Sequence, residues 1–261
     1  QAAALTNSLT ISHAAAARSR AVGQQTPQRL HVTPPGITPD RRAGPDAAEL
    51  RASLRAEFDI GQDDFLLLQV GSGFRMKGLD RSLRALAALP AGLRTRSRLI
   101  AIGRDKPGPF LRLARRLGIG GALTILPGRD DIPRFLQGAD LLLHPAYYEN
   151  TGAVLIEAVV AGLPVLVTAA CGYAEHVAAS GCGQVLPEPF RQADMNAALA
   201  RMLGGGERPV WQQAGRGYGR KGDRGSRQER ADDGIEQVLR RGGWSSTPPG
   251  GMRWGGIRAA R

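Results

Sequence analysis

The stretch at residues 140–168, DLLLHPAYYENTGAVLIEAVVAGLPVLVT, constrains the fold more than any other part of the chain. Residues 140–144 form a short apolar run that ends in His-Pro, which indicates a buried strand that stops there. A polar segment follows at 146–151, and the small and aliphatic residues at 152–161 favour a helix packed under a sheet. The sequence GLP ends that helix, and residues 165–167 begin another buried strand. The stretch therefore predicts strand, loop, helix and strand.

Two carboxylates in this stretch are spaced to contact two parts of one long ligand. Glu149 lies in the predicted loop, and Glu157 lies eight residues later in the predicted helix. At a rise of about 1.5 Å per residue, the second carboxylate lies well below the first. The plain structural alternative is a solvated loop glutamate and an exposed helix glutamate.

The residues between these glutamates open the predicted helix. An open helix end attracts phosphate, because unsatisfied N–H donors and the positive end of the helix dipole converge there. The residues at this end are Asn150, Thr151, Gly152, Ala153 and Val154. The loop also follows a buried strand, and open α/β sheets bind ligands at the carboxyl ends of their strands. We therefore expect a pyrophosphate group to bind here.

The rest of the pattern predicts an α/β fold. Further strands are expected at residues 65–70, 98–102, 123–126 and 184–186, and helices at 47–58, 79–89, 109–117, 174–179 and 192–203. Strands that alternate with helices at this spacing imply a parallel sheet with right-handed crossovers. The predicted fold class is a Rossmann-like parallel sheet with helices on both faces. Asp131 is expected to cap a short helix that carries Pro133 in its first turn.

A glycine-rich turn, GSGFRMKG, follows the first predicted strand of this sheet. Gly71 and Gly73, with Ser72 between them, let the backbone approach a ligand closely. Lys77 ends the turn with a mobile positive charge, and a diphosphate leaving group needs its developing negative charge neutralised. Lys77 is therefore the first candidate for that role, with Arg75 as the nearest second cation. The alternative is that Lys77 is an ordinary exposed residue at a helix start.

A nicotinamide dinucleotide is the other ligand that such a turn suggests. The motif G-x-G-x-x-G would need its third glycine at Met76, where it is absent. The turn is therefore assigned to a diphosphate and not to a dinucleotide cofactor.

Several segments together resemble the family 4 retaining glycosyltransferases, which have two Rossmann-like domains in the GT-B arrangement. The segments are LLLQVGSGFRMKGLDRS, GRDD, LLLHPAYYENTGAVLIEAVVAGLPVL, ACGYAEHVA and EPF. The likeness runs from about residue 30 to 203 and is strongest to glucosyltransferases of the lipopolysaccharide core. It implies that the chain is the carboxy-terminal donor half of the fold, with most of the acceptor domain missing.

The resemblance also implies roles for single residues. Glu157 would hold the ribose hydroxyls, Glu149 would lie near the sugar, and the backbone at Arg129 would contact the base. An Arg and a Lys bind the diphosphate in the family, commonly as neighbours. Here Met76 precedes Lys77, so either Arg75 reaches the same site from a shifted backbone or one charge is lost. His144, which ends the strand before the loop, is expected to be a packed structural residue more often than a catalytic base.

The implied activity is transfer of glucose from UDP-glucose to heptose of the lipopolysaccharide core with retention at the anomeric carbon. Neither a metal nor a cofactor is expected, and the UDP-sugar is a substrate. One route is double displacement, which would need a carboxylate nucleophile, and Glu149 is the one candidate here. In the other route, the acceptor attacks the sugar on the same face from which the diphosphate leaves, helped by Lys77 and Arg75. Both routes stay open. Other functions considered are a family 4 transferase of another nucleotide sugar and RNA binding through the Arg/Gly-rich end of the chain.

The domain organisation follows from composition and from the resemblance. Residues 1–33 are predicted to be a remnant of the acceptor domain, 34–45 an interdomain linker and 46–204 the donor-binding domain. Residues 205–261 are rich in Gly and Arg and are expected to be largely disordered. They carry 12 Lys and Arg against 6 Asp and Glu, which is half of the net charge of +12.

The expected location is cytoplasmic and peripheral, on the inner face of the inner membrane. No apolar run reaches the roughly 18 residues of a membrane span, and the beginning lacks a signal-peptide pattern. The expected partners are a nucleotide sugar, the lipopolysaccharide core acceptor and an anionic lipid surface, but no nucleic acid. Cys171 and Cys182 are expected to be small buried residues, with a disulfide as the alternative. Because the sequence does not begin with Met, we expect an internal fragment. Because most of the acceptor domain is missing from it, we expect it to be weakly active or inactive alone.

Overall fold

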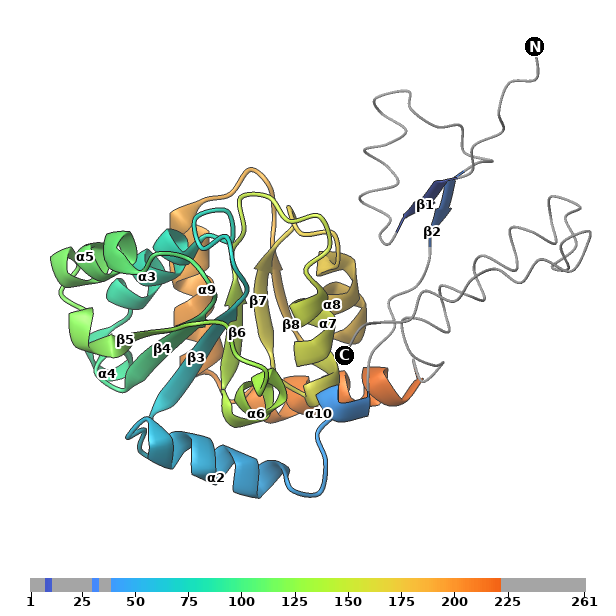
Figure 1. Ribbon diagram of the computed structural model, residues 1–261, viewed down its shortest axis with the longest axis horizontal. Helices are drawn as coiled ribbons and strands as arrows, with labels where there is room; N and C mark the ends of the chain where they lie inside the picture. The colour runs from blue at the N-terminus through green and yellow to red at the C-terminus, as the bar shows by residue number, and fades with distance from the viewer. Residues whose placement is uncertain (1–7, 11–29, 33–38, 222–261) are drawn as a thin grey trace, which may run out of the picture.

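The computed structural model describes residues 8–10, 30–32 and 39–221 of the 261-residue chain (Figure 1). The first two of these segments are strands β1 (Ser8–Thr10) and β2 (Leu30–Val32), which pair in parallel. They form a small sheet of their own. All other elements belong to residues 39–221, on which the candidate site is built.

A six-stranded parallel sheet forms the centre of this part of the chain. Its strands are β3 (Phe65–Val70), β4 (Ser97–Ile102), β5 (Leu123–Leu126), β6 (Leu141–His144), β7 (Val165–Thr168) and β8 (Gly183–Leu186). Their spatial order is β5-β4-β3-β6-β7-β8. Each predicted strand is present within one residue of its expected bounds, because each is an apolar run bounded by turn residues.

Helices cover both faces of this sheet (Figure 1). They are α2 (Ala47–Glu57), α3 (Leu79–Ala87), α4 (Ala91–Arg94), α5 (Gly108–Arg116), α6 (Ile132–Gly138), α7 (Ala153–Ala161), α8 (Ala174–Ser180), α9 (Gln192–Gly204) and α10 (Arg208–Lys221). Two short 3-10 helices are η2 (Pro39–Arg41) and η3 (Gly120–Ala122).

The two faces have separate hydrophobic cores, as the alternation of side chains along a strand requires. Leu66 in β3 belongs to the core that contains Leu155 of α7. Its neighbour Leu67 belongs to the other core, with Leu83 of α3 and Leu199 of α9. The predicted parallel sheet with helices on both faces is therefore confirmed.

The helix α10 corrects one expectation from composition. Residues 205–221 were predicted to belong to a largely disordered segment, but α10 packs against α7 and α8. A Cβ on Gly215 would lie 2.4 Å from the Val159 carbonyl oxygen and 2.6 Å from Cys182 Sγ, so glycine lets the two helices approach closely. The prediction for residues 222–261 falls outside the described residues. In the described part, no helix combines the length and the apolar character that a bilayer crossing needs.

Candidate active site

The two loops that carry most of the predicted site residues leave neighbouring strands. β3 and β6 pair in parallel, with Leu67 opposite Leu141, so the loops at residues 71–78 and 145–152 begin side by side. The strand order reverses here, because β4 and β5 lie beyond β3 whereas β7 and β8 lie beyond β6 (Figure 1). We call these two loops the switch-point site, since open α/β sheets bind ligands where their strand order reverses.

Lys77 and Glu149 meet at the switch-point site. The Lys77 ammonium donates a hydrogen bond to Oε2 of Glu149 and forms an ion pair with it. Both side chains are largely buried, with 17% and 16% of their surface exposed. The structure thus brings the cation predicted for a diphosphate next to the carboxylate predicted for the sugar.

The neighbours of Glu149 keep it ionised. The imidazole of His144 and the ammonium of Lys77 lower the pKa of Glu149 to about 2, against the opposing effect of partial burial. His144 is fully buried, and that burial lowers its own pKa, so its ring is neutral at pH 7. Its Nε2 lies 3.7 Å from Glu149 Oε2, which is longer than a hydrogen bond, so the Lys77 ammonium is the cause of the lowered Glu149 pKa that the geometry supports. The full burial of this ring, which keeps it from solvent, suits the predicted structural role better than that of a base.

The glycine turn is pressed against the loop from the neighbouring strand. Gly78 has φ +72°, and a Cβ there would lie 2.0 Å from the carbonyl oxygen of Pro145. Tyr147 N donates to the Met76 carbonyl over 2.8 Å, which joins the two loops a second time. Glycine is needed at position 78 for both its conformation and this close approach.

Backbone amides of the turn already have partners within the protein. The Gly71 amide donates to a β4 carbonyl over 2.8 Å. The Gly73 amide donates to Oδ2 of Asp105 over 2.7 Å, and the Ser72 hydroxyl accepts from the Arg104 amide over 3.1 Å. The amides of Gly71 and Gly73 are therefore already used within the protein, and the Lys77 ammonium, paired with Glu149, is a charged donor of this turn that an anion could share.

The opening of α7 lies directly beside Glu149. Gly152 has φ +76°, and a Cβ on it would lie 3.3 Å from Glu149 Cγ. The segment before α8 donates to the carbonyl oxygens of Glu149 and Thr151 over 3.1 and 2.8 Å, which fixes the loop. Asn150 is exposed, Thr151, Ala153 and Val154 are partly exposed, and Gly152 is buried. Because α7 begins at Ala153, the amides of Ala153 and Val154 lack intrahelical partners, whereas the Leu155 amide donates to the Gly152 carbonyl over 2.9 Å.

Glu157 pairs with the predicted linker and not with Lys77. Arg41 Nη1 lies 3.7 Å from Glu157 Oε2, and each side chain is 24% exposed. Arg41 is the last residue of η2, which packs against α6 and α7. A ribose at Glu157 would have to share this carboxylate with Arg41 or displace it, and the ribose role itself stays a prediction.

Two of the predicted arginines lie apart from Lys77 and Glu149. Arg75 is exposed, and its side chain makes no hydrogen bond or ion pair within the described part of the chain. It lines a separate cavity of about 340 Å³ with Asp80, Phe110 and Tyr147. Its share in the diphosphate site stays a prediction.

Arg129 is bound to its neighbour in the turn after β5. Its Nε and Nη2 each donate to the Asp131 carboxylate over 2.7 Å. This pairing raises the pKa of Arg129 and lowers that of Asp131. Asp131 stands at the N-cap position of α6 but makes no side-chain cap hydrogen bond, so the predicted capping role is wrong. The carboxylate pairs with a guanidinium instead, because charge-assisted bidentate contacts are the stronger ones.

Two residues that support the site were not singled out from the sequence. Gln69 is fully buried at the end of β3 and donates from Nε2 to the Lys77 carbonyl over 2.9 Å, while its Oε1 accepts from Ser82. It is the one polar residue in the strand FLLLQV, and that was a usable signal. Arg81 stacks between the rings of Tyr147 and Phe190, at 3.6 and 3.7 Å from their centroids. Its partners are distant in sequence, so no local signal existed.

The remaining candidate side chains are the two thiols and the residue types that can bind metal ions. No group of three or more His, Cys, Asp or Glu residues is placed there to hold a metal ion. Cys171 and Cys182 are buried and free, and burial raises the pKa of their thiols to about 11 and about 12. They are the small buried residues that were predicted, and the disulfide alternative is wrong.

The comparison with known families agrees with this geometry. Residues 51–216 match the family described as "Glycosyl transferases group 1". This chain belongs to the group 1 glycosyl transferases. The glycosyltransferase resemblance predicted from the sequence is thereby confirmed, and the matched region contains both loops of the switch-point site and the first part of α10.

Two curated relatives illustrate the range of the family. Lipopolysaccharide glucosyltransferase WaaG from Escherichia coli (strain K12) is 44% identical over 213 residues, which are 81% of this chain and 57% of the relative. D-inositol 3-phosphate glycosyltransferase from Streptomyces scabiei (strain 87.22) is 32% identical over 189 residues, 68% of this chain and 41% of the relative. The chain thus spans less than two thirds of either relative.

Solved structures support the fold of this family member. The crystal structure of WaaG, a glycosyltransferase involved in lipopolysaccharide biosynthesis, matches with a TM-score of 0.81 and 41% identity over 86% of this chain and 61% of that one. Anabaena Alr3699/HepE in complex with UDP-glucose matches with a TM-score of 0.75 over 90% of this chain and 64% of that one. At 18% identity, the second likeness concerns the fold alone.

Proposed function

We propose that this chain is the donor-binding half of a retaining glucosyltransferase that transfers glucose from UDP-glucose to heptose of the lipopolysaccharide core. The observation that carries the proposal is the Lys77–Glu149 ion pair at the switch-point site, where an α/β sheet of this kind binds its ligand. The 44% identity to a lipopolysaccharide glucosyltransferase supports the choice of sugar and acceptor.

Lys77, Glu149 and Glu157 each have a role in this proposal. As the bond between the anomeric carbon and the diphosphate breaks, Lys77 neutralises the charge that develops on the departing oxygen. Glu149, ionised with a pKa of about 2, only accepts hydrogen bonds and so suits the hydroxyl groups of the sugar. Glu157, one helical turn into α7, takes the ribose hydroxyls. Since Lys77 supplies the positive charge, the scheme needs no metal and no cofactor.

The step that forms the new bond has two forms in this scheme. In the first, Glu149 bonds to the anomeric carbon as the bond to the diphosphate breaks. The acceptor oxygen then bonds to that carbon as the bond to Glu149 breaks, and the acceptor proton passes to an oxygen of the released diphosphate. In the second, the acceptor oxygen bonds to the anomeric carbon on the face that the diphosphate leaves, and its proton passes to the departing phosphate oxygen. Lys77 acts in the same way in both, so its variant tests donor binding whichever form operates.

The acceptor half of the enzyme is part of the same proposal. Met76, Tyr147 and Tyr148 are about half exposed beside the switch-point site, which suits an edge that another domain covers. The net charge of +12 suits docking on anionic lipid at the inner face of the inner membrane. Nucleic acid is not a partner in this proposal. Sedimentation with phosphatidylglycerol vesicles, compared with phosphatidylcholine vesicles, tests the membrane part, and equal binding to both would contradict it.

The test is a calorimetric titration of the chain with UDP, UDP-glucose, GDP and ADP. Loss of one charge-assisted contact costs about 1.5–3 kcal/mol, so Lys77→Gln should weaken UDP binding by roughly 10- to 100-fold. Lys106→Gln is the matched control, because Lys106 is exposed on the loop after β4 and the change in charge is identical. Equal UDP affinity of the two variants, or equal affinity of the chain for UDP, GDP and ADP, would refute the proposal.

A further inference from the structure

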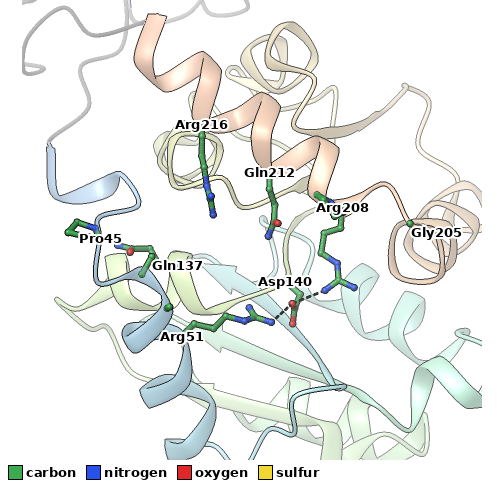
Figure 2. A pocket seen from close by; sticks show the side chains of 12 residues that line it. Pro45, Arg51, Gln137, Asp140, Gly205, Arg208, Gln212 and Arg216 are labelled. Atoms are coloured by element: carbon green, nitrogen blue, oxygen red, sulfur yellow. Dashed lines mark hydrogen bonds and ion pairs between the residues drawn. The ribbon is translucent and has the colours of Figure 1, made fainter.

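A second cavity lies at the opposite edge of the sheet. It measures about 730 Å³, and its lining comes from the start of α2, the end of α6 and the first turns of α10 (Figure 2). Asp140, at its centre, directly precedes β6 and accepts a hydrogen bond from the Leu66 amide over 2.8 Å. The cavity is therefore at the amino ends of the strands, whereas the switch-point site is at their carboxyl ends.

Positive charge exceeds negative charge around this cavity. Three arginines, Arg51, Arg55 and Arg208, share the single carboxylate of Asp140, at 2.7, 3.1 and 2.9 Å. Arg216 lines the cavity as well, and Asp140 is the one acidic side chain among its described lining residues. One carboxylate balances one of these guanidinium groups, so the others leave an excess of positive charge in a partly buried place.

Several polar groups around the cavity have unused capacity. Arg208, Gln212 and Arg216 follow one another at intervals of four residues, so they lie on one face of α10, and Figure 2 shows all three pointing into the cavity. The side chain of Arg216, which is exposed, makes no hydrogen bond or ion pair within the described residues. The buried Oε1 of Gln137, on α6, has no hydrogen-bond partner in this part of the chain. A buried polar atom of this kind normally has a partner.

We propose that this cavity, which we call the arginine cavity, binds a phosphate group carried by a small hydroxylated molecule. The free N–H groups of Arg208 and Arg216 suit phosphate oxygens, because a guanidinium presents paired donors to them. Gln137 Oε1 accepts from a hydroxyl of the same ligand. A volume of about 730 Å³ accommodates a phosphate monoester of a sugar or of glycerol. The ligand is therefore either a soluble phosphate ester or the headgroup of a phospholipid.

The test compares Arg216→Gln with Arg112→Gln in titrations with glycerol 1-phosphate, glucose 6-phosphate and inorganic phosphate at low salt. Arg112 is exposed on α5, outside the cavity lining, so its variant makes the same change in charge elsewhere. We expect Arg216→Gln to weaken binding of the two esters by about 10-fold or more, and Arg112→Gln to leave it unchanged. Arg216 has no partner to lose among the described residues, so the variant should fold, and an unaltered circular dichroism melt verifies this.

Two further measurements separate the outcomes. Lys77→Gln should leave ester binding intact, which keeps this proposal independent of the switch-point site. Vesicles of phosphatidylglycerol distinguish the two sources, because a headgroup ligand predicts weaker sedimentation of Arg216→Gln than of Arg112→Gln, whereas a soluble ester predicts equal sedimentation. Equal ester affinity of the Arg216 and Arg112 variants, or loss of ester binding in Lys77→Gln, would overturn the proposal.

Discussion

The ion pairs at the carboxyl ends of the strands differ from those at the amino ends, which we call the carboxyl edge and the amino edge of the sheet. At the carboxyl edge, Lys77 faces Glu149, so one cation meets one anion. At the amino edge, Asp140 alone meets three guanidinium groups. The first pair comes from two loops and the second cluster from helices that enclose a strand start. At the carboxyl ends, a charged ligand has to compete with a single ion pair between loops, whereas at the amino ends one carboxylate joins residues of two helices.

The largest expected effect is at the amino edge. Asp140→Asn would leave Arg55, which is 7% exposed at its side chain, without its anion. Breaking a buried ion pair by removing one partner costs about 3–5 kcal/mol, so the urea midpoint of unfolding should fall steeply. Asp130→Asn, at an exposed carboxylate, is the control. If both variants unfold at the wild-type midpoint, the amino edge does not hold the domain together.

A glycine pair tests the contact between the two loops at the carboxyl edge. Gly78 and Gly118 both have φ +72°, but a Cβ at Gly118 meets nothing within 4 Å, whereas one at Gly78 meets the Pro145 carbonyl. Gly118→Ala should cost about 1–2 kcal/mol from the left-handed backbone alone. Gly78→Ala should cost clearly more and should weaken UDP binding too. Thermal unfolding and calorimetry measure both effects, and equal losses in the two variants would show that the loops are not in contact.

The smallest effect concerns pH at the Lys77–Glu149 pair. Folding lowers the pKa of Glu149 from 4.5 to about 2. The ionised carboxylate therefore stabilises the folded protein at any pH above 4.5, the pKa of an ordinary glutamate. That contribution is present in full above about pH 4.5 and is lost as the pH falls towards 2. The difference in urea midpoint between wild type and Glu149→Gln should thus be constant from pH 8 to 5 and shrink below that. A difference that grows on acidification would contradict the lowered pKa.

The strands and most helices were predictable because local patterns specify them. The runs at β3 and β6 are apolar and end at Gly or His-Pro, which fixes both their type and their bounds. The helix α10 was missed because its sequence RPVWQQAGRGYGRK contains glycines that break isolated helices. Packing against α7 overrides that preference, and Gly215 permits the close approach.

The sequence predicted the site residues that lie in loops directly after a strand, but not the contacts that these residues make with other segments. Lys77 and Glu149 were each predicted to follow a strand, but the strand order that makes β3 and β6 neighbours and brings the two side chains into contact was not predicted. Two contacts of the predicted site residues were not predicted. Asp105 accepts a hydrogen bond from the Gly73 amide, and Arg41 forms an ion pair with Glu157, each from a separate segment of the chain. Such contacts depend on tertiary placement, which no short sequence window contains.

The shared carboxylate of Asp140 has a consequence for how this domain can be moved as a unit. Arg51 comes from the first α-helix described after the linker and Arg208 from the last, and both end on the same Oδ1 atom. The first and last helices of residues 39–221 are thus joined through one carboxylate, which favours the folding of this segment as a unit when it is fused to another protein. In a chimaera with a relative's acceptor domain, residues 39–221 should keep their fold, whereas truncation between α9 and α10 would remove the contact of Arg208 with Asp140.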